Sequence, residues 1–142
     1  MSTNPGPAAL LDRLTAATNA HDLDALVDCF AADYVNETPV HPERGFTGAD
    51  QVRRNWTQIF AAVADVQAEV LRSAVDGDLV WAELEHRGTR RDGSPHLMRG
   101  VVILRVADGR ATWARFYLEP VIPGTAAIDE VVRNTLAGRA TS

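Results

Sequence analysis

The sequence predicts an α+β domain in which a curved, mixed or antiparallel β-sheet wraps around one long helix, with a helical hairpin at the N-terminal end. Two observations support this prediction. Stretches with helical and with strand-like periodicity follow a fixed order: two short helices, one strand, a longer helix and then four strands. Tight turns separate the last four strands, and connections this short require antiparallel neighbours. This order predicts one sheet and one central helix.

Apolar residues at helical spacing indicate the first two helices. Leu10, Leu11 and Leu14 share one face of a helix that we expect over residues 8–20. Asp22 is a suitable N-cap for a second helix. The apolar residues of this second helix repeat at i, i+3, i+4 and i+7: Leu23, Leu26, Val27 and Phe30. The two helices are expected to form a hairpin.

A strand is expected next, over residues 34–38. A loop follows over residues 39–45, because its two prolines and one glycine disfavour regular structure. Thr47 and Asp50 have the spacing of a capping box at the start of the third helix. The apolar face of that helix consists of Val52, Trp56, Ile59, Phe60 and Val63. The sheet is expected to curl around this helix.

Four strands are expected over residues 66–75, 79–90, 96–106 and 110–119, with Asp-Gly pairs in the turns between them. After a Pro-Gly break at residues 123–124, apolar residues at helical spacing indicate one last amphipathic helix: Ile128, Val131, Val132 and Leu136. Such a short helix is stable only if it packs against something. One arrangement that this permits is a helix that fills the pocket of its own chain.

A chain of 142 residues has the size of one domain. We expect residues 1–7 to be disordered, residues 8–120 to form the domain, and residues 121–142 to form a C-terminal extension with a short helix.

Composition excludes several classes of function. The net charge is −5 and the 14 basic residues, all arginine, are scattered, so nucleic-acid binding is not expected. The absence of lysine excludes lysine Schiff-base chemistry. No apolar stretch approaches the roughly 20 residues that span a bilayer, and no targeting segment is recognisable, so we expect a cytoplasmic protein that does not bind membranes. The four histidines lack metal-binding spacing, and we expect neither a metal site nor a cofactor.

Several short segments carry a resemblance to a known family. They are Asn19-Ala20-His21-Asp22-Leu23-Asp24, Phe30-Ala31-Ala32-Asp33, Glu37-Thr38-Pro39 and Thr47-Gly48-Ala49-Asp50. This pattern resembles the SnoaL-like branch of the nuclear transport factor 2-like (NTF2-like) superfamily over about residues 10–120. The resemblance implies a cone with a pocket at its wide end. It also implies an activity such as that of polyketide cyclases, ketosteroid isomerases or epoxide hydrolases, or ligand binding without catalysis.

The acid-base residues of two of these enzyme classes are absent. The resemblance places the isomerase residues at Leu14, Thr38 and Val102, none of which is an acid. It places the arginine and two aspartates of the epoxide hydrolases at Leu84, His86 and Phe116. Only His86 keeps a titratable group at a catalytic position, where it would replace the pocket aspartate of the cyclases.

Alternation along the strands sorts their residues between two faces. The more apolar face of the second long strand carries Leu84 and His86, and its neighbours carry Val102 and Phe116, which we expect in the interior with them. A histidine among apolar neighbours exchanges protons near neutral pH, so His86 is the leading candidate for acid-base work. The alternative is a structural histidine that is hydrogen-bonded by its neighbours.

The first strand offers polar groups for the opposite wall. Tyr34, Asn36 and Thr38 lie on one face of the strand, and Glu37 lies on the other. Either an amide-hydroxyl pair or a carboxylate therefore faces the ligand. Glu37 paired with His86 would form a proton shuttle, whereas a solvent-exposed Glu37 is the ordinary alternative. His41 and Arg44 in the loop are candidates for contacting an anionic or carbonyl-bearing ligand, or are ordinary loop residues.

Aromatic residues have two expected places. Trp56 and Phe60 either stack on a planar ligand or belong to the core. Trp81, Trp113 and Tyr117 lie on the outer face, which is too aromatic for a simple solvated surface and suggests a homodimer interface.

Taken together, these features predict a protein that binds or transforms a small apolar carbonyl-containing or epoxide molecule, with His86, Glu37 and Asn36 as candidate catalytic residues. The competing hypothesis is a non-catalytic ligand-binding or protein-interaction module.

Overall fold

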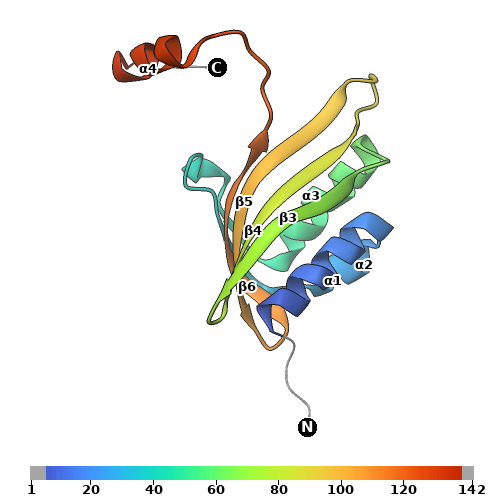
Figure 1. The fold of residues 1–142 in the computed structure, drawn as a ribbon. Helices are drawn as coiled ribbons and strands as arrows, with labels where there is room; N and C mark the ends of the chain where they lie inside the picture. The colour runs from blue at the N-terminus through green and yellow to red at the C-terminus, as the bar shows by residue number, and fades with distance from the viewer. Residues whose placement is uncertain (1–5, 139–142) are drawn as a thin grey trace.

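The computed structural model describes residues 6–138 and consists of a six-stranded sheet with three helices against its concave side (Figure 1). Helix α1 (Pro7–Ala20) and α2 (Leu23–Asp28) form the expected hairpin, and α3 (Ala49–Ala62) is the second long helix. Residues 1–5 of the expected disordered start lie outside the described residues. None of the helices in residues 6–138 is long and apolar enough to cross a membrane.

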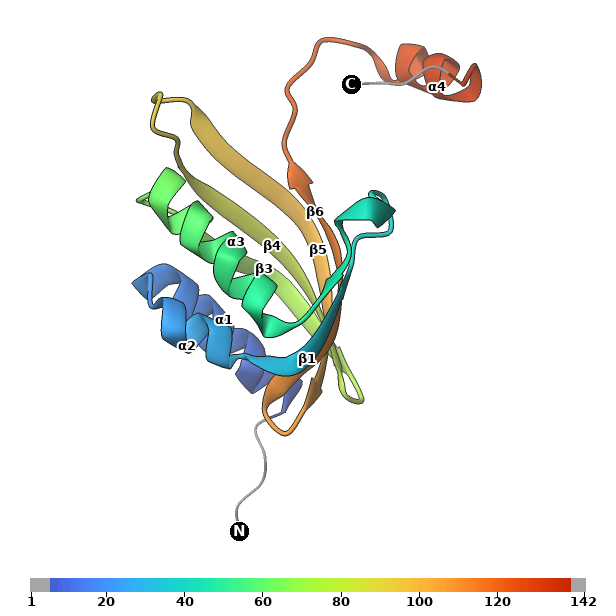
Figure 2. The same ribbon diagram turned by 180° about the vertical axis from the view of Figure 1, so that it is seen from behind.

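The sheet has the order β2-β1-β6-β5-β4-β3. Its strands are β1 (Phe30–Glu37), β2 (Phe46–Thr47), β3 (Gln67–Asp76), β4 (Leu79–Thr89), β5 (Pro95–Ala107) and β6 (Arg110–Pro120). Strands β1 and β6 are parallel, and all other pairs are antiparallel. The sheet is therefore mixed, and Figure 2 shows it bending around the helices.

Two local expectations are corrected. Phe30 continues the apolar repeat of α2 in the sequence, but it is the first residue of β1. Gly48, with φ of 103°, takes the N-cap position of α3, and no side chain of residues 6–138 caps this helix, so the Thr47–Asp50 capping box does not form.

Glycine and bulges shape the sheet. Asp108 and Gly109 both have positive φ, as a tight turn between antiparallel strands requires. Strict alternation in the last strand, which puts Phe116 in the interior, also predicts Thr112 there. A bulge at Arg105/Val106 of the β5–β6 pair shifts this alternation, and Ala111 is fully buried instead. At Gly100, with φ of 154°, an added Cβ would lie 2.0 Å from the backbone oxygen of Tyr117. Only glycine fits where β5 and β6 bend together.

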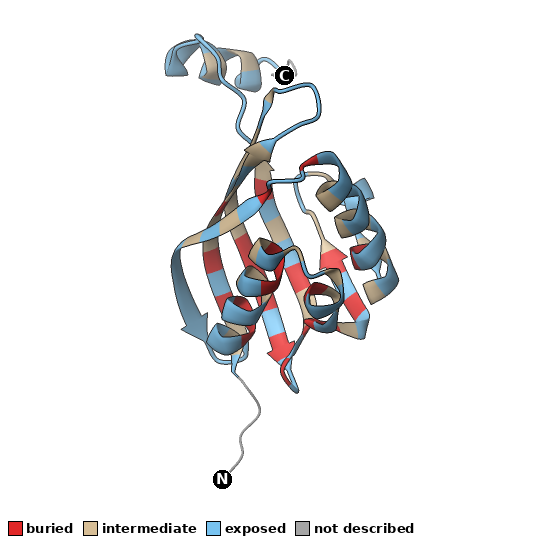
Figure 3. Cartoon of the chain, turned by 90° about the vertical axis from the view of Figure 1, so that its right-hand side faces the viewer, coloured by how far each residue is buried: buried red, intermediate tan, exposed pale blue. Residues whose placement is uncertain are grey.

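The core lies between the sheet and the helices (Figure 3). Leu10, Leu26, Tyr34 and Leu104 are almost completely buried within it. Each large apolar side chain buried in this way contributes about 1.5–3 kcal/mol to folding. This core fixes the backbone of β1, β4 and β6, which carry the polar groups described below.

Helix α4 (Ile128–Leu136) forms where the sequence predicts it but lies away from the sheet (Figure 1). Ile128 and Leu136 are 73% and 82% exposed. The arrangement in which this helix fills the pocket is therefore wrong for this structure.

Candidate functional site

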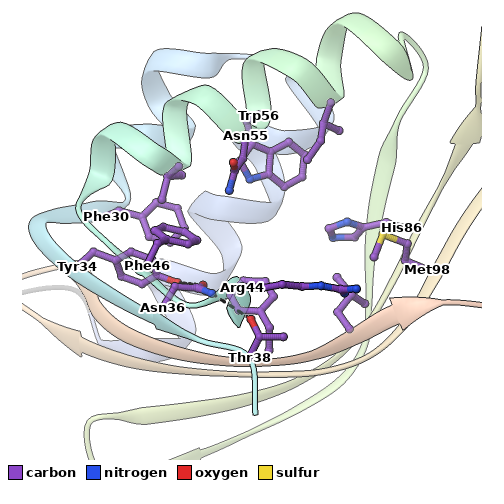
Figure 4. Close-up of a pocket in the computed structure, with 14 residues that line it drawn as sticks. Phe30, Tyr34, Asn36, Thr38, Arg44, Phe46, Asn55, Trp56, His86 and Met98 are labelled. Atoms are coloured by element: carbon purple, nitrogen blue, oxygen red, sulfur yellow. Dashed lines mark hydrogen bonds between the residues drawn. The ribbon is translucent and has the colours of Figure 1, made fainter. Parts of the chain in front are cut away.

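A cavity of about 330 Å³ opens between α3 and the concave face of the sheet (Figure 4). This volume lies at the lower end of the range for pockets that bind small molecules. Apolar and aromatic side chains form most of the lining: Phe30, Phe46, Val52, Trp56, Ile59, Met98, Phe116 and Leu118. The polar lining groups come from Tyr34, Asn36, Thr38, Arg44, Asn55 and His86. The cavity is thus apolar with a few polar groups, as ligand sites usually are.

His86 projects from β4 into this cavity beside Trp56, with the ring centroids 5.9 Å apart. The pKa of His86 is lowered to about 4, mainly by burial and also by repulsion from the nearby His96. Within residues 6–138 no protein group hydrogen-bonds to this ring. His86 is therefore a neutral imidazole whose nitrogens are available to a ligand.

Three side chains of the β1 wall form a hydrogen-bonded chain on the other side of the cavity. The Tyr34 hydroxyl donates to Asn36 Oδ1 over 2.7 Å, and Asn36 Nδ2 donates to Thr38 Oγ1 over 3.4 Å (Figure 4). Burial raises the pKa of Tyr34, which keeps its hydroxyl protonated as a donor. Because Asn36 Oδ1 and Thr38 Oγ1 both accept, the second amide hydrogen and the Thr38 hydroxyl hydrogen are left for a ligand.

The sequence leaves open which face of β1 points into the cavity, and the structure answers this. Asn36 is buried and pairs in register with Ala114 of β6, whose side chain is also in the core. Glu37 faces the opposite side, where its Oε1 accepts from Arg115 Nε over 2.7 Å. This hydrogen bond lowers the pKa of Glu37. Of the two alternatives for Glu37, the pairing with His86 does not form, and the amide-hydroxyl pair faces the cavity instead of the carboxylate.

The other expected ligand-binding residues lie at different depths. Leu84 and Val102 line a smaller inner void of about 50 Å³, which shares His86, Trp56 and Phe116 with the main cavity. Phe60 stacks on His21 with centroids 5.0 Å apart and contacts Trp56, so it supports the cavity wall from behind. His41 does not line the cavity, and its Nε2 lies 2.6 Å from Glu119 Oε1.

One polar residue of the lining, Asn55, was not predicted from the sequence. Asn55 lies three residues after Val52 and so shares the inner face of α3, a spacing that was available in the sequence. Arg44, which the sequence gives with His41 as a candidate for contacting an anionic or carbonyl-bearing ligand, lines the cavity from its loop. No group of three or more potential metal ligands occurs among residues 6–138.

The model of the SnoaL-like domain family matches residues 11–114 of the chain, which is well over half of its length. The chain belongs to the SnoaL-like family. This match runs from within α1 to the first half of β6 and includes Tyr34, Asn36 and Thr38 as well as His86. No curated protein matches the sequence.

Solved structures are similar to this SnoaL-like domain over most of its length. IdmH from Streptomyces antibioticus, proposed to be a polyketide cyclase, is 25% identical, with a TM-score of 0.69 over 79% of this chain and 91% of IdmH. A proposed polyketide cyclase from Sinorhizobium meliloti is 27% identical, with a TM-score of 0.60 over 78% and 93% of the two chains. An NTF2-like protein of unknown function from an Exiguobacterium species is 21% identical, with a TM-score of 0.64 over 80% and 99%. These likenesses agree with the SnoaL-like branch of the NTF2-like superfamily.

Proposed function

We propose that this protein binds an apolar, carbonyl-containing small molecule and catalyses its enolisation, the step that aldol cyclisation and double-bond isomerisation share. The observation that carries the proposal is the unpartnered imidazole of His86 on one wall and the donor pair of Asn36 and Thr38 on another. The two similar structures proposed to be polyketide cyclases agree with this reaction class. His86, Asn36 and Thr38 are the groups we assign to the reaction.

The polar chain on β1 supplies the electrophilic half of the chemistry. In this proposal the substrate carbonyl oxygen accepts from Asn36 Nδ2 and from the Thr38 hydroxyl. Tyr34 holds the Asn36 amide in the orientation that presents N–H rather than C=O to the cavity. Donors fixed in this way stabilise the negative charge that develops on the carbonyl oxygen as an enolate forms.

His86 supplies the base. A ring nitrogen takes the proton from the carbon next to the carbonyl, and the electron pair of that C–H bond forms the enolate. Burial makes an isolated imidazolium unfavourable here, but the enolate anion forms at the same time and offsets that cost. The imidazolium then returns the proton to the same carbon or to another one. In an aldol step the enolate carbon instead attacks a second carbonyl carbon, and the oxygen of that carbonyl takes up the proton from the imidazolium.

Exchange of the substrate's α-protons for deuterium tests this proposal directly. Enolisable aromatic ketones, polyketides and epoxides are first screened for thermal stabilisation of the protein, and proton exchange of the binding ketones is then followed by NMR in deuterated water. We expect His86→Ala to retain binding and to lower the exchange rate at least about a hundredfold, as loss of a general base does. His96→Ala removes a histidine that does not line the main cavity and should leave the rate nearly unchanged. Equal rates in the wild type and His86→Ala would contradict the catalytic role and leave a ligand-binding module.

We also propose that two copies associate through the outer face of the sheet. Trp81 and Tyr117 are 46% and 37% exposed on this face. Trp113 lies between the guanidinium groups of Arg105 and Arg115, each 5.1 Å from its ring centroid. Trp81→Glu should convert a dimer to a monomer in analytical ultracentrifugation, whereas a monomeric wild type would contradict the proposal.

A further inference from the structure

Among residues 6–138, the lining of the cavity includes one cationic group, at its mouth, and no acidic residue. Arg44 ends the short 3₁₀ turn η1 (Pro42–Arg44) between β1 and β2. Its side chain extends from the wall of Asn36 and Thr38 toward the side of the cavity that carries His86 and Met98 (Figure 4). None of the 14 lining residues is Asp or Glu.

The backbone of the loop fixes the position of Arg44. His41 N donates to Thr38 O over 2.8 Å, and Arg44 N donates to His41 O over 2.9 Å. Gly45 follows where an added Cβ would lie 3.2 Å from the backbone oxygen of Asn36, so the loop lies close against β1. The guanidinium is therefore presented from a braced turn rather than from a free loop.

The charge of Arg44 is only weakly compensated within the protein. Within the described part of the chain, the nearest carboxylate oxygen is Oε2 of Glu119, 4.0 Å from Arg44 Nη1, which is too long for a hydrogen bond. The other oxygen of Glu119, Oε1, lies 2.6 Å from His41 Nε2. No side-chain hydrogen bond of Arg44 occurs among residues 6–138, so its planar set of N–H donors is free to bind a ligand.

We propose that the substrate is an apolar keto acid, with its carboxylate bound by Arg44 at the cavity mouth and its hydrocarbon body inside. This inference rests on the proposed function and names the substrate class of the same site. Arginine binds carboxylates through two parallel N–H donors, which fixes orientation as well as charge. The ketone of the substrate then lies within the cavity, where Asn36, Thr38 and His86 are located. Arg44 is thereby a specificity-determining residue.

A matched pair of ligands tests the proposal. Naphthaleneacetate and naphthaleneacetamide have the same aromatic body and differ in charge, and isothermal titration calorimetry measures the affinity of each. We expect the wild type to bind the acid about tenfold more tightly than the amide, and Arg44→Gln to abolish this preference. Arg44→Lys should keep part of the preference, since it retains the charge without the planar donors. Raising the salt concentration should reduce the preference, because the mouth is exposed to solvent.

Two further variants separate a local contact from a change in overall charge. Arg133→Gln removes one positive charge from exposed helix α4 and should leave the preference unchanged. Glu119→Gln removes the carboxylate that competes for Arg44 and should tighten binding of the acid about threefold while leaving the amide unaffected. Equal affinities of the acid and the amide for the wild type, or a preference that survives in Arg44→Gln, would overturn the inference while leaving the proposed function intact. Binding of neither compound would contradict both.

Discussion

The lowered pKa of His86 makes the stability of this protein depend on pH in a defined way. The folded protein holds this pKa at about 4, whereas in the unfolded chain it returns to about 6.5. Above pH 6.5 the ring is neutral in both states and contributes no pH dependence. Between these values the unfolded chain binds a proton that the folded protein does not, so the free energy of unfolding falls as the pH falls. Below pH 4 both states are protonated and the loss is complete.

The size of this effect follows from the difference between the two pKa values. Each unit of pKa corresponds to 1.36 kcal/mol, so the difference between 6.5 and about 4 amounts to about 3 kcal/mol. His86→Leu removes the titrating group and keeps the cavity wall apolar. We therefore expect the stability of the wild type relative to His86→Leu to fall by about 3 kcal/mol between pH 6.5 and pH 4.

Urea unfolding of both proteins at a series of pH values measures this difference. Taking the difference between the two proteins cancels the titration of the carboxylates and largely that of His96, whose pKa is also lowered by burial and by Arg90. A relative stability that changes by less than about 1 kcal/mol over this range would refute the reasoning. It would mean that the imidazole is hydrated or hydrogen-bonded in the folded protein rather than desolvated.

Three further predictions concern the polar wall, the bend of the sheet and the C-terminal extension. Tyr34→Phe removes the donor that orients Asn36, and we expect it to cost about 1 kcal/mol in urea unfolding and to lower the exchange rate of a bound ketone; unchanged exchange would contradict the orienting role. Gly100→Ala brings a Cβ against backbone and should lower the stability by more than about 2 kcal/mol, whereas Gly124→Ala, with open space around it, should change the stability by less than about 0.5 kcal/mol; similar effects of both would be inconsistent with the close approach of β5 and β6. Truncation after Pro123 removes α4 and should leave the melting temperature of the remaining domain within about 3 °C of the full chain, while a larger drop would show that the extension packs on the domain.

The sequence predicts most of this fold because its signals are local. The strands β3 to β6 and their Asp-Gly turns follow from alternation and turn chemistry, and His86 and Phe116 reach the cavity wall that this alternation assigns to them. Thr112 shows the limit of this reasoning, because a single bulge moves Ala111 into the core in its place. Bulges depend on how two strands fit together, which a pattern in one strand does not contain.

The parts of the site that could not be predicted depend on contacts between distant segments. Whether Asn36 or Glu37 faces the cavity is set by the parallel pairing of β1 with β6, about 80 residues away in the chain. The sequence gives His41 and Arg44 together as candidate ligand contacts, and the way their loop folds back over β1 decides that Arg44 lines the cavity and His41 does not. The helical pattern of α4 is local and predictable, but no local pattern specifies whether its apolar face packs on the domain, and in the structure Ile128 and Leu136 are exposed.

The most direct test of the central claim is an NMR spectrum of the histidine side chains, recorded with and without an enolisable ketone. The account predicts that the His86 ring is neutral near pH 7, that it titrates near pH 4, and that its signal shifts when the ketone binds while that of His96 does not. A His86 signal that titrates near 6.5 and is unaffected by a bound ketone would contradict the account.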